Sequence, residues 1–400
     1  MFTLNKQKKR LLFVNGHLHI GGVERTLVDL VRHLDFSQYN VDVLVFEAGG
    51  EYIKELPGEA NLIVFDTTSV WGPLGATLWN SLTAGRFRLT IWRIVMALSA
   101  RFGARVFALL RNILPIKKRY DCAIAYRPGT CANFVAFAVN APLKILWWHH
   151  GIYPTIPEQI ATLTKTWNKF DKIISVSENL AKRLRSSFLS LAHRIYVIHN
   201  LIDPEDLLQK ANDELTNDRE NDCVELVSVG NLRPGKRFDN VILAAASLRQ
   251  LLSCNFHWVI VGEGEMRPKL QHMIAEMHLE NNVHLLGKKD NPYPFIRKAD
   301  IFIHPSYTEA LCTVILEAMA LEIPCVVTKT DVPQDFTYDG VNCLETKQGA
   351  DALAEGIRNM ILLGQGRKEL VINAKRMIDE EYRPEKILPK IYSLFDAAKE

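Results

Sequence analysis

The chain has 400 residues, of which 48% are hydrophobic and 23% are charged, and its formal net charge at pH 7 is +3. This length is enough for two or three domains with sizeable cores, and the near-balance of charge argues against a dedicated nucleic-acid binder. The seven cysteines are scattered, odd in number and without a CxxC pair. Such usage is typical of reduced core thiols in a cytosolic protein and not of a disulfide or zinc framework.

The N-terminal residues 1–16 are charged and then apolar, but the apolar run is only as long as a strand. It lacks the hydrophobic region and the cleavage site of a signal peptide. Because no stretch of about 18 uncharged apolar residues exists, the sequence predicts no membrane-spanning helix. We therefore expect a cytoplasmic protein.

In the first half of the chain, apolar runs of strand length alternate with amphipathic runs of helix length, which is typical of parallel βαβ units. We expect strands at 10–15, 41–46, 62–65, 122–126, 145–149, 172–176 and 195–198. We expect helices at 23–34, 130–138, 157–169 and 178–188. The sequence thus predicts a doubly wound α/β domain over residues 1–202.

The segment 67–120 interrupts this alternation. It contains nine Arg or Lys residues, Trp79 and Trp92, and neither Asp nor Glu. Wound into helices, 86–119 carries Arg on one side and Trp, Ile, Val and Leu on the other, which is the composition of a helix in a membrane interface. We expect it to dock on an anionic membrane surface. The alternative is an amphipathic insertion that packs on its own domain, with its Arg side chains reaching solvent.

The acidic, polar stretch 203–222 predicts a domain linker. A second series of strands follows at 226–229, 257–261, 283–286, 301–304 and 325–328, again with helices between them. It predicts a second doubly wound domain over 223–382. In such folds ligands bind in the crevice outside the carboxyl ends of the strands.

Two glutamates in the block 306–328 are the main candidates for ligand binding. Glu309 follows a strand-like run, and Glu317 lies in an apolar helix predicted at 313–320. Two carboxylates on so apolar a background are costly to bury unless each has a partner. A carboxylate pair suits the vicinal hydroxyls of sugars because each ionised oxygen accepts strong hydrogen bonds. The block predicts the sugar-nucleotide cradle of a glycosyltransferase, and the alternative is a helix with one solvated Glu at each end.

Two turns offer groups for an anion. Gly21 and Gly22 lie between the first strand and the first helix, where the backbone can approach a ligand and the helix N-terminus presents N–H groups. Arg233, Lys236 and Arg237 follow the first strand of the second domain and suit a diphosphate. The alternative for the glycines is a tight strand-to-helix turn.

The sequence Gly262–Glu263–Gly264 follows the next strand and would admit a nucleotide base against the backbone, or form another turn. His149 and His150 end a strand of the first domain, where a histidine can bond a leaving phosphate, line a sugar site or be structural. The chain contains no DxD, HExxH, Walker P-loop or GxSxG sequence. We therefore expect neither a metal nor a cofactor, and we expect Lys, Arg and helix N-termini to neutralise the diphosphate.

Together these motifs resemble the retaining glycosyltransferases of family 4, and they do so in order over nearly the whole chain. GGVER at 21–25 is similar to the family's N-terminal glycine loop, and 291–309 is similar to its approach to the first glutamate. Lys236 matches its phosphate-binding lysine, and Glu309 and Glu317 match its paired glutamates. The resemblance implies the α/β GT-B fold, with two Rossmann-like domains facing each other across a cleft and a last helix over 383–400 that crosses back to the first domain.

The resemblance also implies roles for single residues. Glu309 would contact hydroxyls of the donor sugar, Glu317 would hold the ribose, and Lys236 would stabilise the departing diphosphate. One of His149 and His150 would lie beside the reacting sugar. Further donor-binding groups would be Gly21, Gly22, Arg233, Gly262, Glu263 and the backbone N–H groups of Leu311, Cys312, Thr313 and Val314.

Two positions depart from the family pattern. Asn231 stands where the family usually has an arginine, two residues before Arg233. Ala310 and Leu311 stand where glycine and an aromatic residue are common.

We therefore expect a retaining, metal-independent transferase that moves a hexose or N-acetylhexosamine from a UDP- or GDP-sugar to a lipid-linked or cell-envelope glycan. It would serve polysaccharide biosynthesis, such as that of lipopolysaccharide or capsule, as a peripheral protein on the inner face of the membrane. Two alternatives remain open. One is a GT-B sugar-nucleotide epimerase, which would not need the lipid-facing segment. The other is a catalytically silent nucleotide-sugar-binding subunit of a glycan assembly complex, which is consistent with Asn231.

Overall fold

A computed structural model describes residues 7–111, 116, 119–149, 154–212, 223–309, 311–331 and 334–396. The chain divides into two units, which we describe separately. The N-terminal unit comprises 1–200 and 388–400, and the C-terminal unit comprises 201–387. The first division falls close to the expected boundary at 202, whereas the closing segment changes unit at 388 and not at 383.

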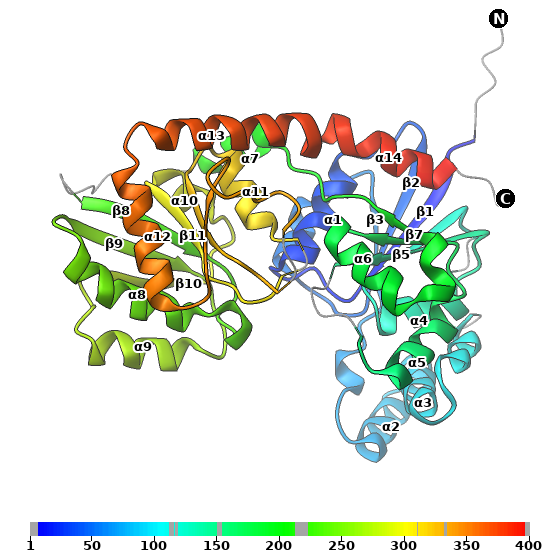
Figure 1. Ribbon diagram of the computed structural model, residues 1–400. Coiled ribbons are helices and arrows are strands. Elements are labelled where there is room, and N and C mark those ends of the chain that lie inside the picture. Colours follow the sequence, from blue (N-terminus) through cyan, green and yellow to red (C-terminus); the bar gives the residue numbers. More distant parts are fainter. Residues whose placement is uncertain are drawn as a thin grey trace, which may run out of the picture. The chain divides into compact units, whose positions relative to one another are not determined.

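The N-terminal unit is built on a parallel sheet (Figure 1). In its described part the sheet has seven strands in the order β3-β2-β1-β4-β5-β6-β7. Their bounds are β1 Lys9–Asn15, β2 Tyr39–Val45, β3 Asn61–Val64, β4 Cys122–Ala125, β5 Leu143–Trp148, β6 Lys172–Ser175 and β7 Ile195–Val197. The central β1 is fully buried from Leu11 to Val14, as expected for a strand covered on both faces. All strands predicted in this half of the chain are confirmed.

Helices follow these strands as the doubly wound pattern requires. They are α1 Gly22–Arg32, α4 Thr130–Phe137, α5 Pro157–Trp167 and α6 Glu178–Ser187, with short helices η1 Glu51–Glu55 and η4 Leu189–Arg194. The four predicted helices are confirmed. The carboxyl ends of the strands and the first turns of α1 and α4 therefore lie at one edge of this sheet.

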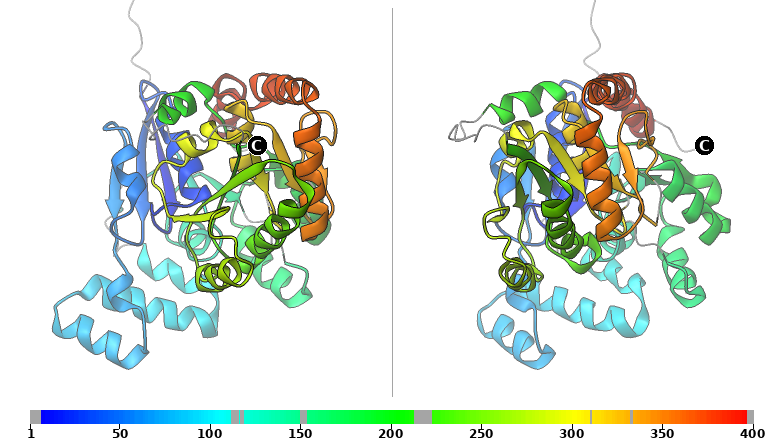
Figure 2. Two further views of the ribbon diagram at one scale, coloured as in Figure 1. Left: turned by 90° about the vertical axis from the view of Figure 1, so that its left-hand side faces the viewer. Right: turned by 60° about the vertical axis from the view of Figure 1, so that its left-hand side comes forward.

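The segment 67–120 forms a helical appendage on the N-terminal unit. It contains η2 Thr68–Val70, α2 Leu74–Thr83, α3 Phe87–Phe102 and η3 Ala104–Leu110. Figures 1 and 2 show α2 and α3, in light blue, projecting beyond the sheet. Trp92 anchors α3, because its ring is buried among those of four phenylalanines, namely Phe46, Phe65, Phe107 and Phe134.

The end of α14 (Pro384–Asp396) belongs to the N-terminal unit. Tyr392 stacks on Tyr39 with ring centroids 5.5 Å apart, and Phe395 meets Phe13 and Tyr39 edge to face. Lys9 Nζ lies 2.6 Å from Asp396 Oδ1. Aromatic packing thus fastens the last turns of the chain to this unit.

The C-terminal unit has a second parallel sheet. Its described part has six strands in the order β10-β9-β8-β11-β12-β13. Their bounds are β8 Cys223–Val229, β9 Asn255–Val261, β10 Val283–Gly287, β11 Ile301–His304, β12 Cys325–Thr328 and β13 Leu344–Thr346. The five predicted strands are confirmed. The edge strand β13 was not predicted, because three residues are too few to show a period of two.

Two groups of helices cover this sheet. One consists of α8 Phe238–Leu251, α9 Arg267–Glu276 and α12 Ala350–Leu362, and α8 packs against both of the others. The other consists of α7 Pro204–Ala211, α10 Tyr293–Lys298, α11 Thr313–Ala320 and α13 Gly366–Met377, with α7 against α10 and α11. The short helices η5 Pro234–Lys236 and η6 Ile378–Tyr382 complete the unit.

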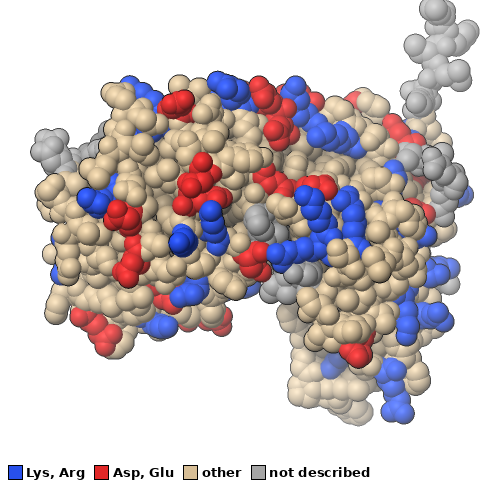
Figure 3. Space-filling model, in the orientation of Figure 1, with Lys and Arg blue, Asp and Glu red and all other residues tan. Residues whose placement is uncertain are grey.

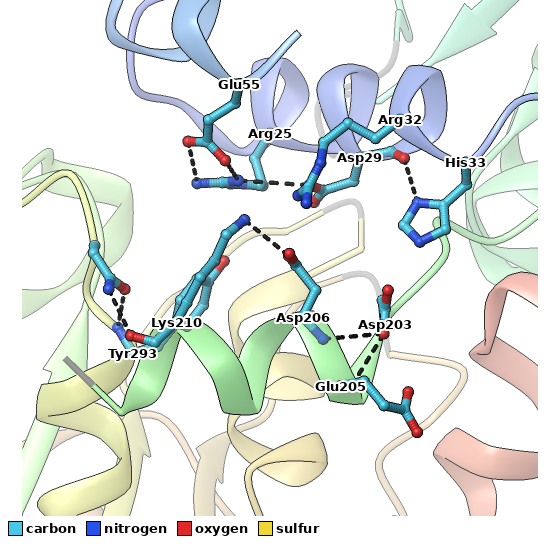
Figure 4. Close-up of polar contacts among 11 residues, drawn as sticks. Arg25, Asp29, Arg32, His33, Glu55, Asp203, Glu205, Asp206, Lys210 and Tyr293 are labelled. Carbon is cyan, nitrogen blue, oxygen red and sulfur yellow. Dashed lines mark hydrogen bonds and ion pairs between the residues drawn. The ribbon is translucent and has the colours of Figure 1, made fainter. Parts of the chain in front are cut away.

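The prediction of a linker at 203–222 is wrong in its first part, which forms α7 (Figure 4). The Asp203 side chain caps this helix and accepts hydrogen bonds from the backbone N–H groups of Glu205 and Asp206 at 3.0 and 3.1 Å. Lys210 Nζ lies 2.8 Å from Asp206 Oδ2 one turn further on. The acidic residues that suggested a linker are thus cap and first-turn residues, which stabilise a helix N-terminus. Residues 213–222 lie outside the described residues.

Candidate active site

Lys236, His304, Glu309 and Cys312 lie together at the carboxyl edge of the C-terminal sheet. Lys236 ends η5 after β8, His304 ends β11, and the other two belong to the loop before α11. The Lys236 ammonium donates a hydrogen bond to Glu309 Oε1, and the same oxygen lies 3.0 Å from His304 Nε2. Cys312 Sγ lies 3.2 Å from that nitrogen. Because β8 and β11 are neighbours in the sheet, residues 73 positions apart meet here.

Burial and charge decide the protonation of this cluster. Burial alone would raise the pKa of Glu309, but the Lys236 ammonium and the His304 ring outweigh it and hold this pKa well below its usual range. Burial lowers the pKa of His304 despite the nearby carboxylate, so the ring is neutral near pH 7. Burial would lower the pKa of Lys236, but Glu309 raises it on balance. The cluster therefore holds an ionised carboxylate against an ammonium.

The start of α11 adjoins this cluster. Glu317 lies on the buried side of α11, and Glu309 has a side chain that is 12% exposed, so neither carboxylate is a solvated end group. Leu311 is buried, and Thr313 and Val314 are half-buried. The backbone N–H of Cys312 donates a hydrogen bond to Oε1 of Gln334 at 3.0 Å. Of the four backbone N–H groups that were expected to bind the donor, this one is therefore hydrogen-bonded within the protein. Ala310 lies outside the described residues.

Gly262 and Gly264 hold the loop after β9 against the loop after β8. Gly262 has a φ of 155°, and a Cβ there would lie 1.9 Å from the carbonyl oxygen of Gly230. At Gly264 the φ is 157°, and a Cβ would lie 2.4 Å from the carbonyl oxygen of Leu232. These glycines therefore allow a close backbone approach within the unit, and the role of this loop in binding a nucleotide base stays a prediction.

The charged side chains of these two loops differ in their surroundings. Glu263 is paired with Arg267 at 2.7 Å across one turn of chain. Arg237 pairs with Asp239 at 3.1 Å, whereas Arg233 is exposed just before η5. Of the three cations expected to grip a diphosphate, Lys236 is the one that joins Glu309.

In the N-terminal unit, Gly21 caps α1 and Gly22 begins it. The structure shows a role for Gly21 that the sequence did not predict. A Cβ there would lie 2.4 Å from Oε2 of Glu24, so the glycine makes room for this fully buried carboxylate. Glu24 Oε1 lies 2.6 Å from Arg127 Nη2 and accepts from Asn15 Nδ2 at 3.0 Å. An ion pair between a buried carboxylate and a half-buried arginine thus links the glycine loop to the end of β4.

Arg25, the last residue of GGVER, pairs with two carboxylates of the N-terminal unit. Its guanidinium makes two hydrogen bonds to Glu55, at 2.6 and 3.1 Å, and lies 3.5 Å from Asp29 (Figure 4). It also covers the ring of Tyr52 at 4.3 Å. Arg25 therefore ties α1 to η1.

His149 follows β5 and packs among aromatic rings. Its ring centroid lies 4.4 Å from that of Tyr126, and it stacks on Trp147 at 6.1 Å. Since Tyr126 follows β4 directly, His149 lies at the carboxyl edge of this sheet, where a site was expected. His150 lies outside the described residues.

Three of these residues escaped the sequence analysis, namely Glu24, Arg127 and His304. Glu24 lies inside GGVER, and a carboxylate in the first turn of a buried helix was its available signal. His304 ends a strand five residues before Glu309, which was also a usable signal. For Arg127 no local pattern exists, because its partner is 103 residues away.

The cluster around Glu309 also resembles a metal site in composition. His304, Glu309 and Cys312 each offer a ligand atom within 4.8 Å of the others. However, the Lys236 ammonium is bonded to the carboxylate oxygen that would bind a cation. The observed donor set therefore fits an ion pair with lysine better than a divalent ion.

The appendage presents apolar and basic side chains to solvent. Trp71, Trp79, Phe87 and Phe102 are each 63–69% exposed. Figure 3 shows this part, at the lower right, as mostly tan with scattered blue atoms. Among the described residues, no helix combines the length and the apolar character that crossing a bilayer requires.

A groove of about 610 Å³ lies between the appendage, α4 and α5. Three cationic side chains line it, those of Arg101, Arg105 and Lys165, together with the polar Asn133 and Thr166. Among its described lining residues none is acidic. The groove therefore has the charge of an anion-binding surface.

Two family models match the chain. The model of glycosyltransferase family 4 matches residues 20–206, and that of glycosyl transferases group 1 matches residues 211–377. The two matches thus follow one another along the chain; the first lies almost wholly in the N-terminal unit and the second in the C-terminal unit.

Curated relatives and solved structures agree with these models. An N-acetylgalactosaminyltransferase of Campylobacter jejuni that acts on a diphospho-undecaprenol is 29% identical over 52% of this chain and 55% of its own. The lipopolysaccharide core biosynthesis glycosyltransferase LpsE of Rhizobium meliloti is 28% identical over 64% and 72%. The chain spans somewhat more than half the length of the first curated relatives it matches.

Among solved structures, HepE from Anabaena in complex with UDP and glucose has a TM-score of 0.72 at 19% identity, and covers 97% of this chain and 99% of its own. At this identity the likeness shows the fold. Family models, relatives and fold agree, and the chain belongs to the family 4, group 1 glycosyltransferases with the GT-B fold.

Proposed function

We propose that this glycosyltransferase moves a hexose or N-acetylhexosamine from a nucleotide diphosphate sugar, with retention at the anomeric carbon and without a metal ion. The observation that carries the proposal is the contact of Lys236 with Glu309 beside His304. An ionised, largely buried carboxylate suits sugar hydroxyls, and an ammonium suits a diphosphate. The carboxyl edge of the C-terminal sheet thus offers a carboxylate for the sugar and an ammonium for the diphosphate of the donor.

The chemistry assigns a separate task to each side chain. Transfer breaks the bond between the anomeric carbon and a diphosphate oxygen, and negative charge grows on that oxygen. Lys236 stabilises this charge, and Glu309 holds the ammonium in place before the donor binds. Glu309 also accepts hydrogen bonds from the donor sugar, and Glu317 accepts them from the ribose. The acceptor hydroxyl oxygen forms the new bond to the anomeric carbon, and its proton passes to the departing diphosphate oxygen.

The acceptor is proposed to be a lipid-linked or envelope glycan. The names of the Campylobacter and Rhizobium relatives support this class. The appendage supports it independently, because exposed Trp and Phe side chains beside Arg are suited to an anionic lipid surface. We infer that the docking surface comprises 86–119 together with the adjoining exposed Trp79, on the inner face of the membrane. Arg101 and Arg105, with the neighbouring Lys165 of the groove, would face lipid phosphates.

Donor binding is tested by thermal unfolding with a panel of UDP- and GDP-sugars, with and without EDTA. A donor at about a hundred times its Kd adds about 2.7 kcal/mol to the free energy of unfolding. We expect a shift with one nucleotide class that EDTA does not change. A shift that requires a divalent ion would contradict metal-independent binding.

Catalysis is tested with Lys236→Ala, and Lys236→Arg serves as the charge-conserving control. Loss of a group that acts on the transition state should lower kcat by about 10²–10³-fold. Unchanged turnover in Lys236→Ala would exclude the assignment. Wild-type protein that binds the donor without turning it over would instead indicate a silent binding subunit, and one that alters the free sugar nucleotide would indicate an epimerase.

Membrane docking is tested by flotation with vesicles of phosphatidylglycerol and phosphatidylcholine, compared with phosphatidylcholine alone. We expect the protein to float with the anionic vesicles, and the double variant Arg101→Gln/Arg105→Gln to float less. The control Leu189→Ala removes a 78% exposed apolar side chain outside the appendage and should change nothing. Flotation that is unaffected by the arginine changes would exclude this surface.

A further inference from the structure

Cys223, Glu225 and His257 lie on one face of the C-terminal sheet, near the amino ends of two neighbouring strands. Cys223 and Glu225 are two residues apart on β8, so their side chains leave the same face. His257 of β9 stands directly opposite Glu225 in the parallel register. The sheet thus brings a thiol, a carboxylate and an imidazole together from two strands.

The spacing of these groups is that of metal ligands. His257 Nδ1 lies 3.4 Å from Glu225 Oε1, and one ligand atom of each residue lies within 4.8 Å of the others. Two ligands bound to Zn²⁺ at about 2.0–2.1 Å with a tetrahedral angle are about 3.4 Å apart. The imidazole and the carboxylate, which pair with each other here, therefore have a separation that zinc ligands also adopt, and the thiol lies within 4.8 Å of both.

The burial of the three residues fits a site that an ion can reach. Cys223 and Glu225 are buried, whereas the His257 side chain is 27% exposed. His284 of β10 adjoins them, with its ring centroid 5.7 Å from that of His257. The backbone N–H of Glu225 donates to Asp300 Oδ2 at 2.9 Å, which holds the start of β8 in place.

We propose that Cys223, Glu225 and His257 bind a zinc ion that cross-links β8 and β9. Thiolate, imidazole and carboxylate are ligands that Zn²⁺ accepts in tetrahedral sites, with an open position left for water or a further side chain. Binding releases the proton of the Cys223 thiol. The thiolate and the carboxylate then balance the charge of the ion.

This site is separate from the Lys236–Glu309 pair. Cys223 begins β8, whereas Lys236 follows its carboxyl end, and seven strand residues span about 20 Å. The ion would therefore stabilise the sheet and leave the proposed metal-independent transfer unchanged. The cysteine spacing suggested no zinc framework, because these ligands are assembled across strands and leave no local CxxC pattern.

The test uses the full chain after treatment with EDTA and removal of the chelator. Co²⁺ binds zinc sites and gives a thiolate-to-metal absorption band when a cysteine is a ligand. We expect one equivalent of Co²⁺ to produce this band in the wild type and Zn²⁺ to displace it. We expect Cys223→Ser to abolish the band, and Cys223→Ser and His257→Gln each to weaken Zn²⁺ binding by at least about tenfold in competition with a chromophoric chelator.

Two control variants each remove a histidine or a cysteine that lies outside the proposed zinc site. His272→Gln removes an exposed histidine that pairs with Glu276 at 3.1 Å on α9, and it should bind Zn²⁺ like the wild type. Cys312→Ser removes the thiol of the other histidine–carboxylate–thiol cluster and should keep the band. The proposal would be overturned if the Co²⁺ absorption band persisted in Cys223→Ser. It would also be overturned if Cys312→Ser lost the band while Cys223→Ser kept it.

A folding defect in Cys223→Ser would leave His257→Gln as the deciding variant. Its melting temperature in EDTA should match that of the wild type in EDTA, and it should no longer rise when Zn²⁺ is added. Equal stabilisation of wild type and His257→Gln by Zn²⁺ would exclude the site.

Discussion

His304 Nε2 lies 3.0 Å from Glu309 Oε1, the oxygen that also accepts a hydrogen bond from Lys236. The histidine side chain is almost fully buried, with 3% exposed, and its pKa lies below the ordinary value of 6.5. A neutral imidazole and an ammonium therefore converge on one carboxylate oxygen. This relationship makes the stability of the C-terminal unit dependent on pH.

His304→Gln tests that dependence. Below about pH 6.5 the unfolded chain binds a proton on this histidine that the folded chain resists, so the wild type loses stability as pH falls toward the lowered pKa. The variant lacks this titration. We expect it to be about 1 kcal/mol or more less stable at pH 8, and the difference to narrow as pH decreases from 8 to 5. Urea unfolding across this range measures the stability of both proteins and how their difference changes with pH.

Glu24→Gln tests the ion pair between Glu24 and the half-buried Arg127 in the N-terminal unit. The carboxylate is fully buried, and its Oε1 lies 2.6 Å from Arg127 Nη2. Replacing this carboxylate should lower the free energy of unfolding by about 2 kcal/mol, because a charge-assisted hydrogen bond is lost while the half-buried arginine keeps its charge. Glu158→Gln, on the exposed side of α5, should change it by less than about 0.5 kcal/mol. Equal effects in urea unfolding would contradict this account.

Gly262→Ala tests the close approach of two loops. An added Cβ would meet the carbonyl oxygen of Gly230 at 1.9 Å, and the φ of 155° is unfavourable for alanine. We expect a loss of about 1–3 kcal/mol in stability and weaker donor binding, because the loop carrying Lys236 must shift. Gly235→Ala is the control, since its Cβ would find its nearest contact at 3.7 Å. A variant as stable as this control would show that the loops can separate without cost.

Trp92→Ala and Trp79→Ala form a matched pair in the appendage. Trp92 is 3% exposed and packs among four phenylalanine rings, so its loss should cost about 3–5 kcal/mol. Trp79 is 69% exposed, so its loss should leave stability within about 0.5 kcal/mol and reduce binding to anionic vesicles. Thermal unfolding and vesicle flotation of both variants separate the two roles. Loss of stability in Trp79→Ala would mean that this side chain packs against the protein.

Local periodicity was enough to predict every strand of the two sheets except β13, the helices beside the N-terminal sheet and the buried helix α11. A helix of this kind buries one stripe of side chains, and a strand buries one or both of its faces. The resulting pattern of apolar residues can be recognised within about ten consecutive residues. The elements that escaped prediction have weak local signals. The strand β13 has three residues, and α7 is rich in the acidic residues that also mark linkers.

The sequence by itself determined the family, the fold class and three candidate donor residues, Lys236, Glu309 and Glu317, because their types and order carry the chemistry. Only the tertiary structure decided which groups meet. It bonds Lys236 to Glu309 beside His304, pairs Glu24 with Arg127, and brings Cys223 and Glu225 to His257. These contacts depend on the order and register of strands that are distant in the chain, and no local pattern records a register.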